Sequence, residues 1–291
     1  MVKEENGVPK PSFCRCEVTT KNTIPWGLCD HQPQDVVVSG HLSYTPLEGV
    51  GHSLPIACLD KTRRLLKRYF MSSFDFTPVL ANRIISVITI DRAEDAEPLT
   101  QALLDGGLNA LEVTFRTPAA PEAVARIKAA FGDKVHLGVG TLLTGEQVVQ
   151  AAEAGATFGL APGLNANVVR AAHERGLGFI PGVMTPSEIE RALELGCKVQ
   201  KFFPADVAGG IKMLKTLSGP YGHTGVKFIP LGGVSAATLK EYLAAPGVAA
   251  VGGSWIADRS LIKAGDWAGI TSLAKKAVAS ATGQEEEGPL E

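Results

Sequence analysis

Residues 110–116 read ALEVTFR, and this stretch is the clearest guide to the fold of the chain. Large apolar side chains alternate with glutamate, threonine and arginine, which predicts a β-strand because successive side chains of a strand point to opposite faces. Glu112, Thr114 and Arg116 would share one face, and the apolar residues would share the other. Polar groups on an inner face cost free energy unless they bind one another or a ligand. The strand therefore indicates a functional site or, alternatively, a structural ion pair between Glu112 and Arg116.

Similar strand segments recur from about residue 83, each followed by a helical segment rich in alanine and leucine. The predicted strands span residues 84–90, 110–116, 136–141, 158–163, 178–183, 198–204, 227–233 and 249–255. Their starts lie roughly 20 to 30 residues apart, a spacing that suits parallel strands joined by helices and is too wide for hairpins. Eight such units in the 221 residues from 71 to 291 predict an α/β protein with a single (β/α)8 TIM barrel, a fold of typically about 250 residues.

Helix starts between the strands carry a capping residue with a partner three positions later. The predicted pairs are Asp91 with Glu94, Thr144 with Gln147, and Thr185 with Glu188. A doubly wound open sheet is the competing architecture. The barrel is favoured because no glycine-rich dinucleotide-binding motif follows the first strand, and because polar residues end nearly every strand.

A lysine occupies the middle of the predicted strand KVQKFFP at 198–204. Lys201 alternates with Val199 and Phe203, so its side chain is expected on a face flanked by apolar neighbours, near the carboxyl end of the strand. Burial disfavours the charged form of an amine, and a neutral amine attacks carbonyl groups. The pattern fits a lysine that forms an imine, and it fits equally a lysine that extends to the rim of the barrel.

The last two predicted strands end in paired glycines, in LGGV at 231–234 and GGSW at 252–255. Glycines let backbone N–H groups approach an anion closely, and TIM barrels commonly bind phosphate after strands seven and eight. Ser254 adds a hydroxyl donor. The two pairs therefore predict a phosphate site, although glycines at strand ends also serve as turn residues.

Residues 1–70 differ in composition from the rest and show no sustained helical or alternating pattern. We interpret them as an irregular N-terminal extension, disordered or artefactual, preceding a barrel domain at 71–291 with Met71 as a plausible original start. A zinc site built from Cys14, Cys16, Cys29 and His31 is disfavoured, because C-x-C followed by C-x-H does not have the usual zinc-ligand spacing.

The overall composition excludes two classes of partner. A net charge of −2, from 28 basic and 30 acidic residues, leaves no positive excess to hold a nucleic-acid backbone. No apolar run approaches the roughly 18 residues of a membrane helix. The acidic start MVKEENGVPK also lacks the basic and apolar regions of a signal peptide, so we expect the protein in the cytoplasm.

Seven short motifs occur in order between about residues 80 and 280. They are LEVTFRT (111–117), GVGT (138–141), APGL (161–164), PGVMTPSE (181–188), KFFPA (201–205), PLGGV (230–234) and GGSW (252–255). Together they resemble the bacterial 2-keto-3-deoxy-6-phosphogluconate (KDPG) aldolase family. The resemblance implies a class I aldolase on a (β/α)8 barrel, a homotrimer that needs no metal or other cofactor and acts on a phosphorylated 2-keto acid.

The same motifs imply roles for individual residues. Lys201 would form the Schiff base, and Glu112 would act as acid and base. The substrate-binding residues implied are, for the carboxylate, Arg116 and Thr141, for the pocket wall, Pro162 and Phe203, and for the phosphate, Gly232, Gly233, Gly253 and Ser254. The expected reaction is cleavage of KDPG to pyruvate and glyceraldehyde 3-phosphate.

Three alternatives stay open at this point. Two are aldolases for related substrates, namely 4-hydroxy-2-oxoglutarate and the galactonate isomer of KDPG. They stay open because no motif in the sequence shows which configuration at C4 of the substrate is accepted. The third is of a different class: a phosphate-binding barrel without Schiff-base chemistry.

Overall fold

A computed structural model describes residues 74–283 of the chain. The described chain is an α/β fold in which every pair of neighbouring strands is parallel. The strands are β1 (Ile84–Ile88), β2 (Ala110–Thr114), β3 (His136–Gly140), β4 (Phe158–Leu160), β5 (Gly178–Ile180), β6 (Gly182–Val183), β7 (Val199–Phe202), β8 (Lys227–Pro230) and β9 (Val251–Gly253). All eight predicted strands are present, and the strand predicted at 178–183 is divided by Pro181 into β5 and β6.

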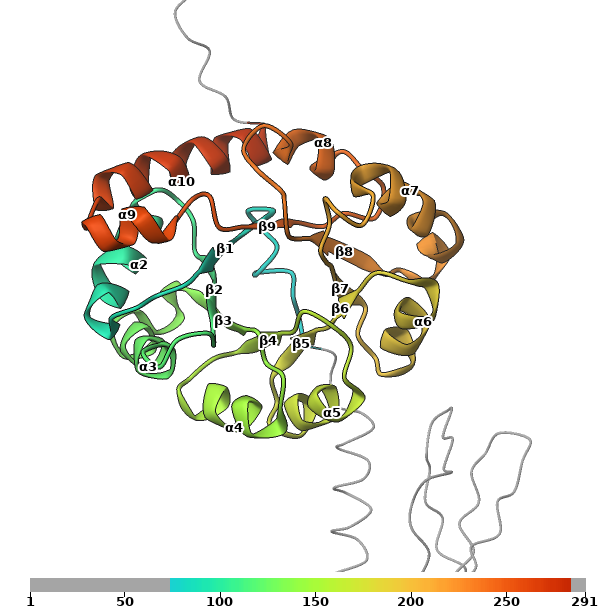
Figure 1. Cartoon of the computed structure of the whole chain (residues 1–291), viewed down its shortest axis with the longest axis horizontal. Helices are drawn as coiled ribbons and strands as arrows, with labels where there is room; N and C mark the ends of the chain where they lie inside the picture. The colour runs from blue at the N-terminus through green and yellow to red at the C-terminus, as the bar shows by residue number, and fades with distance from the viewer. Residues whose placement is uncertain (1–73, 284–291) are drawn as a thin grey trace, which may run out of the picture. The chain divides into compact units, whose positions relative to one another are not determined.

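The strands form a curled sheet in two hydrogen-bonded parts. The first part has the order β5-β4-β3-β2-β1-β9 and the second has the order β6-β7-β8. Figure 1 shows the strands around a central region, with the helices outside them. This arrangement directs one face of each strand towards the helices and the other towards the interior.

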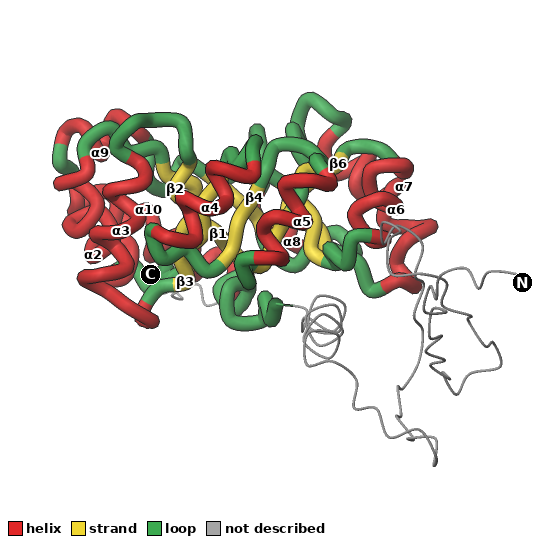
Figure 2. Tube along the Cα trace, turned by 90° about the horizontal axis from the view of Figure 1, so that it is seen from below, coloured by secondary structure: helices red, strands yellow, loops and turns green. Residues whose placement is uncertain are grey.

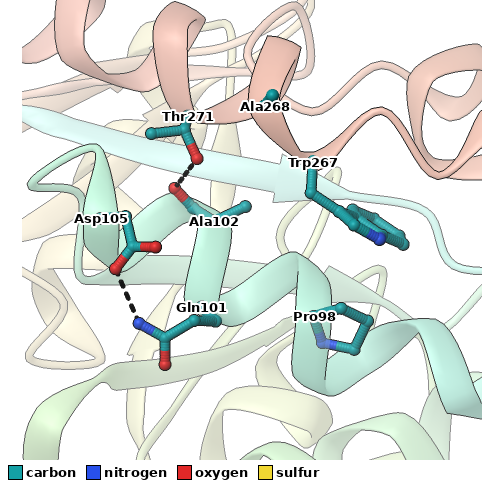
Figure 3. Close-up of a pocket in the computed structure, with 7 residues that line it drawn as sticks. All are labelled: Pro98, Gln101, Ala102, Asp105, Trp267, Ala268 and Thr271. Carbon is teal, nitrogen blue, oxygen red and sulfur yellow. Dashed lines mark hydrogen bonds between the residues drawn. The ribbon is translucent and has the colours of Figure 1, made fainter.

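Helices alternate with the strands along the chain and lie on the outer side of the sheet (Figures 1 and 2). The α-helices are α2 (Ala96–Asp105), α3 (Ala120–Phe131), α4 (Gly145–Glu153), α5 (Ala166–Glu174), α6 (Pro186–Glu194), α7 (Gly210–Tyr221), α8 (Leu239–Leu243), α9 (Arg259–Ala264) and α10 (Trp267–Thr282). Short 3-10 helices are η1 (Ala93–Asp95), η2 (Gly132–Lys134) and η3 (Gly222–Thr224). The last helix, α10, packs against α2, where Thr271 Oγ1 donates to the Ala102 carbonyl at 2.9 Å. Residues of the two helices line a surface groove at this contact (Figure 3).

Two of the three predicted helix caps are confirmed. Thr144 and Thr185 each start a helix with a complete capping box. The cap predicted at Asp91 is wrong: η1 starts after Arg92 without a side-chain cap. The Asp91 carboxylate instead accepts hydrogen bonds from Arg259 at the start of α9, a partner distant in sequence.

The apolar residues divide into two clusters, one on each side of the sheet. The outer cluster joins strands to helices and contains Leu111, Val113 and the half-buried Phe115, as the alternation in β2 predicts. The inner cluster is lined by strand residues and also contains residues from the segment before β1, including Phe74 and Phe76. In the view of Figure 1 this first described segment overlaps the central region that the strands surround. The interior is therefore a packed core on which a polar site is built.

The described residues contain no helix long and apolar enough to cross a membrane. Within 74–283 there is also no group of three or more histidine, cysteine, aspartate or glutamate side chains placed to hold a metal ion. The disfavoured cluster of Cys14, Cys16, Cys29 and His31 lies outside the described residues.

Candidate active site

A buried amine and a buried carboxylate meet inside the sheet. Lys201 Nζ on β7 donates to Glu112 Oε1 on β2 at 3.4 Å, and the two side chains are 8% and 1% exposed. The second carboxylate oxygen, Glu112 Oε2, is buried and has no hydrogen-bond partner. An unpaired buried acceptor is costly, and such atoms mark places where a ligand or proton is received. The pair thus combines a nucleophile with a free proton acceptor.

The position of the Glu112 carboxylate depends on a glycine of the neighbouring strand. A Cβ atom on Gly140 of β3 would lie 1.9 Å from Glu112 Oε1 and 2.7 Å from its Cδ. Only a residue without a side chain leaves room for the carboxylate there. Sequence reasoning did not identify Gly140, although two glycines at alternate positions of the predicted strand 136–141 are a signal of space left on one face.

Lys201 has the apolar neighbours that the alternation in KVQKFFP predicts. Val199 and Phe203 both belong to the inner cluster, and Lys201 Nζ lies 5.3 Å from the centroid of the Phe203 ring. The alternative in which Lys201 extends to the rim is wrong, because the residue is only 6% exposed. Phe203 therefore forms one wall of the space around the amine.

Arg116 corrects two sequence-based expectations. The strand was predicted to run to residue 116, but β2 ends at Thr114, and Arg116 is exposed in the following loop. An ion pair between Glu112 and Arg116 is also wrong, since Glu112 pairs with Lys201. Arg116 instead donates from its guanidinium to the Thr89 hydroxyl at 2.7 Å. Sequence reasoning missed Thr89, which is the first residue after β1.

Thr141 and Pro162 also lie after the carboxyl ends of strands. Thr141 follows β3 with φ of 62°, a left-handed conformation that is strained for a β-branched residue. Pro162 follows β4, and its carbonyl oxygen approaches Gly182 of β6 so closely that a Cβ on Gly182 would be 2.1 Å away. Gly182 in turn pairs with Lys201. Thr141 and Pro162 are both half-buried, at the end of the sheet where Lys201 lies.

The glycine pair after β8 adopts a backbone that side chains disfavour. Gly232 and Gly233 have φ of 86° and 89°. A Cβ on Gly232 would lie 3.1 Å from the Phe203 ring, which places this turn beside the lysine pocket. Sequence reasoning missed Asp206, whose side chain would lie 2.2 Å from a Cβ on Gly233. The same carboxylate adds to burial in raising the pKa of Tyr242.

The glycine pair at the end of β9, Gly252 and Gly253, requires a correction to the reasoning about Gly253. The sequence predicts that Gly253 lacks a side chain so that its backbone can approach an anion, but a Cβ there would lie 1.5 Å from the Trp255 ring. The missing side chain is explained by the packing of this tryptophan. Ser254 is exposed, so its hydroxyl is the group at this strand end that is free to meet a ligand.

The part of the chain that is similar to known proteins is the part that carries this site. Residues 78–273 match the KDPG and KHG aldolase family, where KHG denotes 2-keto-4-hydroxyglutarate, the same compound as 4-hydroxy-2-oxoglutarate. The chain belongs to this aldolase family. The match spans most of the described residues and includes every candidate site residue named above.

Individual relatives of this aldolase are known by sequence and by structure. The chain is 48% identical over 194 residues to 2-dehydro-3-deoxy-phosphogluconate aldolase of Treponema pallidum, covering 67% of this chain and 91% of the relative. It is 39% identical over 198 residues to the KHG/KDPG aldolase of Escherichia coli K12, covering 68% and 92%. A crystal structure of KDPG aldolase from Legionella pneumophila, with pyruvate captured as a covalent carbinolamine, matches with a TM-score of 0.66 and 42% identity, covering 68% of this chain and 96% of that one.

Proposed function

We propose that this protein is a class I aldolase that cleaves KDPG to pyruvate and glyceraldehyde 3-phosphate. The observation that carries the proposal is the buried contact of Lys201 Nζ with Glu112 Oε1, which leaves Glu112 Oε2 without a partner. Membership of the KDPG and KHG aldolase family supports it. An amine and a proton acceptor in one apolar pocket are the groups that imine chemistry on a 2-keto acid requires.

The first half of the reaction forms the imine. Lys201 must attack as the neutral amine, and the Glu112 carboxylate at 3.4 Å is placed to accept the ammonium proton. The Nζ atom then bonds to C2 of the keto acid and gives a carbinolamine. Glu112 donates its proton to the departing hydroxyl group, so water leaves, a protonated imine remains and Glu112 is again a carboxylate. The positive imine nitrogen accepts the electron pair that is released when the bond between C3 and C4 breaks.

The second half transfers protons at the same carboxylate. Glu112 takes the proton of the C4 hydroxyl as the C3–C4 bond breaks, so glyceraldehyde 3-phosphate leaves and a pyruvate enamine remains on Lys201. Glu112 then returns the proton to C3, and water hydrolyses the imine to free pyruvate and the amine. One carboxylate serves both steps because the reacting carbons are adjacent to the imine.

The two ends of the substrate are held by different loops. We assign the C1 carboxylate to Arg116 and Thr141, because a guanidinium binds a carboxylate through two parallel N–H groups. Arg116 is exposed in the loop after β2, two residues beyond Thr114, the last residue of the strand that carries Glu112. Pro162 and Phe203 complete the apolar wall. Fixing the carboxylate end directs C2 towards Lys201.

The phosphate end is assigned to the turns after β8 and β9. The backbone N–H groups of Gly232 and Gly233, shortly after β8, would meet the phosphate together with the Gly253 backbone at the end of β9 and the Ser254 hydroxyl directly after it. Asp206 lies against Gly233, and its negative charge weakens dianion binding on that side of the turn. This observation favours 4-hydroxy-2-oxoglutarate, which carries no phosphate, as the second candidate substrate.

Comparing the two substrates tests the assignment. We expect kcat/KM for KDPG, measured by coupled detection of released pyruvate, to exceed kcat/KM for 4-hydroxy-2-oxoglutarate. The reverse order would make the unphosphorylated keto acid the substrate. Pyruvate release from neither compound, with folded protein, would refute the proposed aldolase.

We also propose the closed (β/α)8 barrel that the sequence predicts. Backbone hydrogen bonds lie at both joins between the two sheets: Lys201 N donates to the Pro181 carbonyl at 2.8 Å, and Ala249 N donates to the Phe228 carbonyl at 3.0 Å. An isolated parallel bridge between Phe228 and Val248 accompanies the second join. These contacts support closure around the inner cluster.

A homotrimer in the cytoplasm remains our proposal for assembly and location. Three large apolar side chains are exposed in the described residues, and they follow β3, β6 and β7: Leu143 at 52%, Met184 at 40% and Val207 at 82%. A contiguous apolar patch marks an interface, and we propose that these three side chains contribute to one between subunits. Light scattering should give three times the chain mass, and a monomer mass at micromolar concentration would contradict this assembly.

A further inference from the structure

A chain of hydrogen bonds connects Arg116 to the backbone of β1. The Arg116 guanidinium donates to Thr89 Oγ1 at 2.7 Å. Thr89 Oγ1 lies 3.1 Å from Thr114 Oγ1, and Thr114 Oγ1 donates to the Ile88 carbonyl at 3.0 Å. Thr114 is buried, Thr89 is half-buried and Arg116 is exposed, so the chain runs from the rim of the sheet into its core.

Counting protons fixes the direction of this chain. The Ile88 carbonyl can only accept, so the single hydroxyl proton of Thr114 points to it. Thr114 Oγ1 is then the acceptor in its contact with Thr89, and the Thr89 hydroxyl must donate. Because Thr89 donates inwards, its lone pairs face the guanidinium. Hydrogen bonds aligned in one direction strengthen one another.

We propose that Thr89 is a positioning residue that orients the Arg116 guanidinium for the carboxylate of the keto-acid substrate. This inference rests on the proposed function, in which Arg116 binds that carboxylate. The Thr89 hydroxyl occupies one N–H group of the guanidinium on the side of β1 and leaves the other donors for the ligand. Without it, an exposed arginine side chain must lose rotamer freedom each time substrate binds.

The loop that carries Thr89 is held independently of the Thr89 hydroxyl. Thr117 Oγ1 donates to the Ile90 carbonyl at 2.5 Å, and Arg259 Nε donates to Asp91 Oδ2 at 2.7 Å. Hydrogen bonding to Arg259 lowers the pKa of Asp91, which keeps the carboxylate charged. Replacing Thr89 by valine therefore removes the hydroxyl and leaves the loop anchored on both following residues.

Kinetics of two matched variants test the proposal. The carboxylate contact is made in the ground state and in the transition state, so Thr89→Val should raise KM about tenfold for KDPG and for 4-hydroxy-2-oxoglutarate alike, with kcat changed less than about threefold. Thr89→Ser keeps the hydroxyl and should restore KM to within about twofold of the wild-type value. An unchanged KM in Thr89→Val, or an equal increase in Thr89→Ser, would overturn the proposal.

A double-mutant cycle separates positioning from a general effect on the fold. In a protein that already carries Arg116→Ala, adding Thr89→Val should change KM by less than about twofold, because the group that Thr89 orients is gone. The same tenfold increase in that background would show that Thr89 acts elsewhere and would refute the proposal. Melting temperatures of all variants identify any loss of folded protein.

A measurement without substrate keeps the inference separate from the proposed function. The NMR order parameter of the Arg116 Nε–H group should be high in the wild type, fall below about 0.6 in Thr89→Val, and remain high in Thr89→Ser. Equal order parameters in the three proteins would contradict positioning by Thr89. If the wild type shows the predicted order but releases no pyruvate from either substrate, the proposed function fails while the positioning stands.

Discussion

Gly140→Ala should impair catalysis by moving Glu112 without removing any functional group. The added Cβ would lie 1.9 Å from Glu112 Oε1, whereas ordinary contact begins near 3.4 Å. The carboxylate oxygen therefore has to retreat by about 1.5 Å, away from its present distance of 3.4 Å to Lys201 Nζ. Displacements of about 1 Å at reacting groups can cost on the order of 10²-fold in rate. We expect kcat for aldol cleavage to fall by about that factor.

A second glycine of the same strand provides the control. Gly138 lies on the same face of β3, and a Cβ there would be 2.3 Å from the Phe158 ring rather than from Glu112. Both variants overpack the interior, which typically costs about 1–3 kcal/mol of stability. Gly138→Ala should lower the melting temperature with kcat reduced much less than in Gly140→Ala.

The assay combines kcat, measured by coupled detection of pyruvate, with the melting temperature of each variant. Equal losses of kcat in the two alanine variants would refute the reasoning, because the effect would then follow overpacking and not the position of Glu112. Wild-type kcat in a folded Gly140→Ala protein would also refute it, since the carboxylate would not need its present position.

Three further results are expected. Deleting residues 1–70 should leave activity and melting temperature nearly unchanged. Deleting residues 1–80 also removes Phe74 and its neighbours from the inner cluster, so the melting temperature should fall sharply. Equal melting temperatures of the two truncated proteins would contradict the role of residues 74–80 in the core. Ser254→Ala should raise KM for KDPG and leave pyruvate trapping at Lys201 unaffected, and a KM that stays the same would exclude the hydroxyl from the phosphate site. Burial raises the pKa of the Cys197 thiol to about 12, so iodoacetamide should label it, by peptide mass, only in denaturant. Because the pKa of this thiol is higher in the folded than in the unfolded chain, the thiol's contribution to stability is complete below pH 9 and is lost as the pH rises towards 12. Labelling of Cys197 in the native protein at pH 8 would contradict its burial.

The sequence identified the inner faces of the strands because alternation has a fixed period of two. Glu112 and Lys201 lie 89 positions apart in sequence. Alternation placed Glu112 on an inner face, whereas it placed Lys201 on a face with apolar neighbours and left extension to the rim equally open. Their contact was not predicted, since no local pattern states which strands face each other across the sheet. The space that Gly140 leaves for the Glu112 carboxylate was missed for the same reason, because it depends on a contact between the neighbouring strands β2 and β3.

The errors concentrate where strands end. Alternation in ALEVTFR continues past Thr114, so Arg116 was assigned to the strand although the chain has already turned into a loop. The cap predicted at Asp91 failed because Arg259, 168 positions later, binds the carboxylate more strongly than a backbone N–H of the next turn. Partners that are remote in sequence decide the conformation of loops, and the residues that we propose to bind the substrate lie mostly in loops.

Trapping of pyruvate with borohydride tests the central claim most directly, because borohydride reduces an imine to a stable amine and reports the covalent step alone. Incubation of the full chain with pyruvate and borohydride should add one reduced pyruvate group, mapped by peptide mass spectrometry to Lys201. The variant Lys201→Ala, folded by its melting temperature, should gain none. An unmodified wild-type protein, or a label on a lysine other than Lys201, would contradict the assignment of this residue as the imine-forming group.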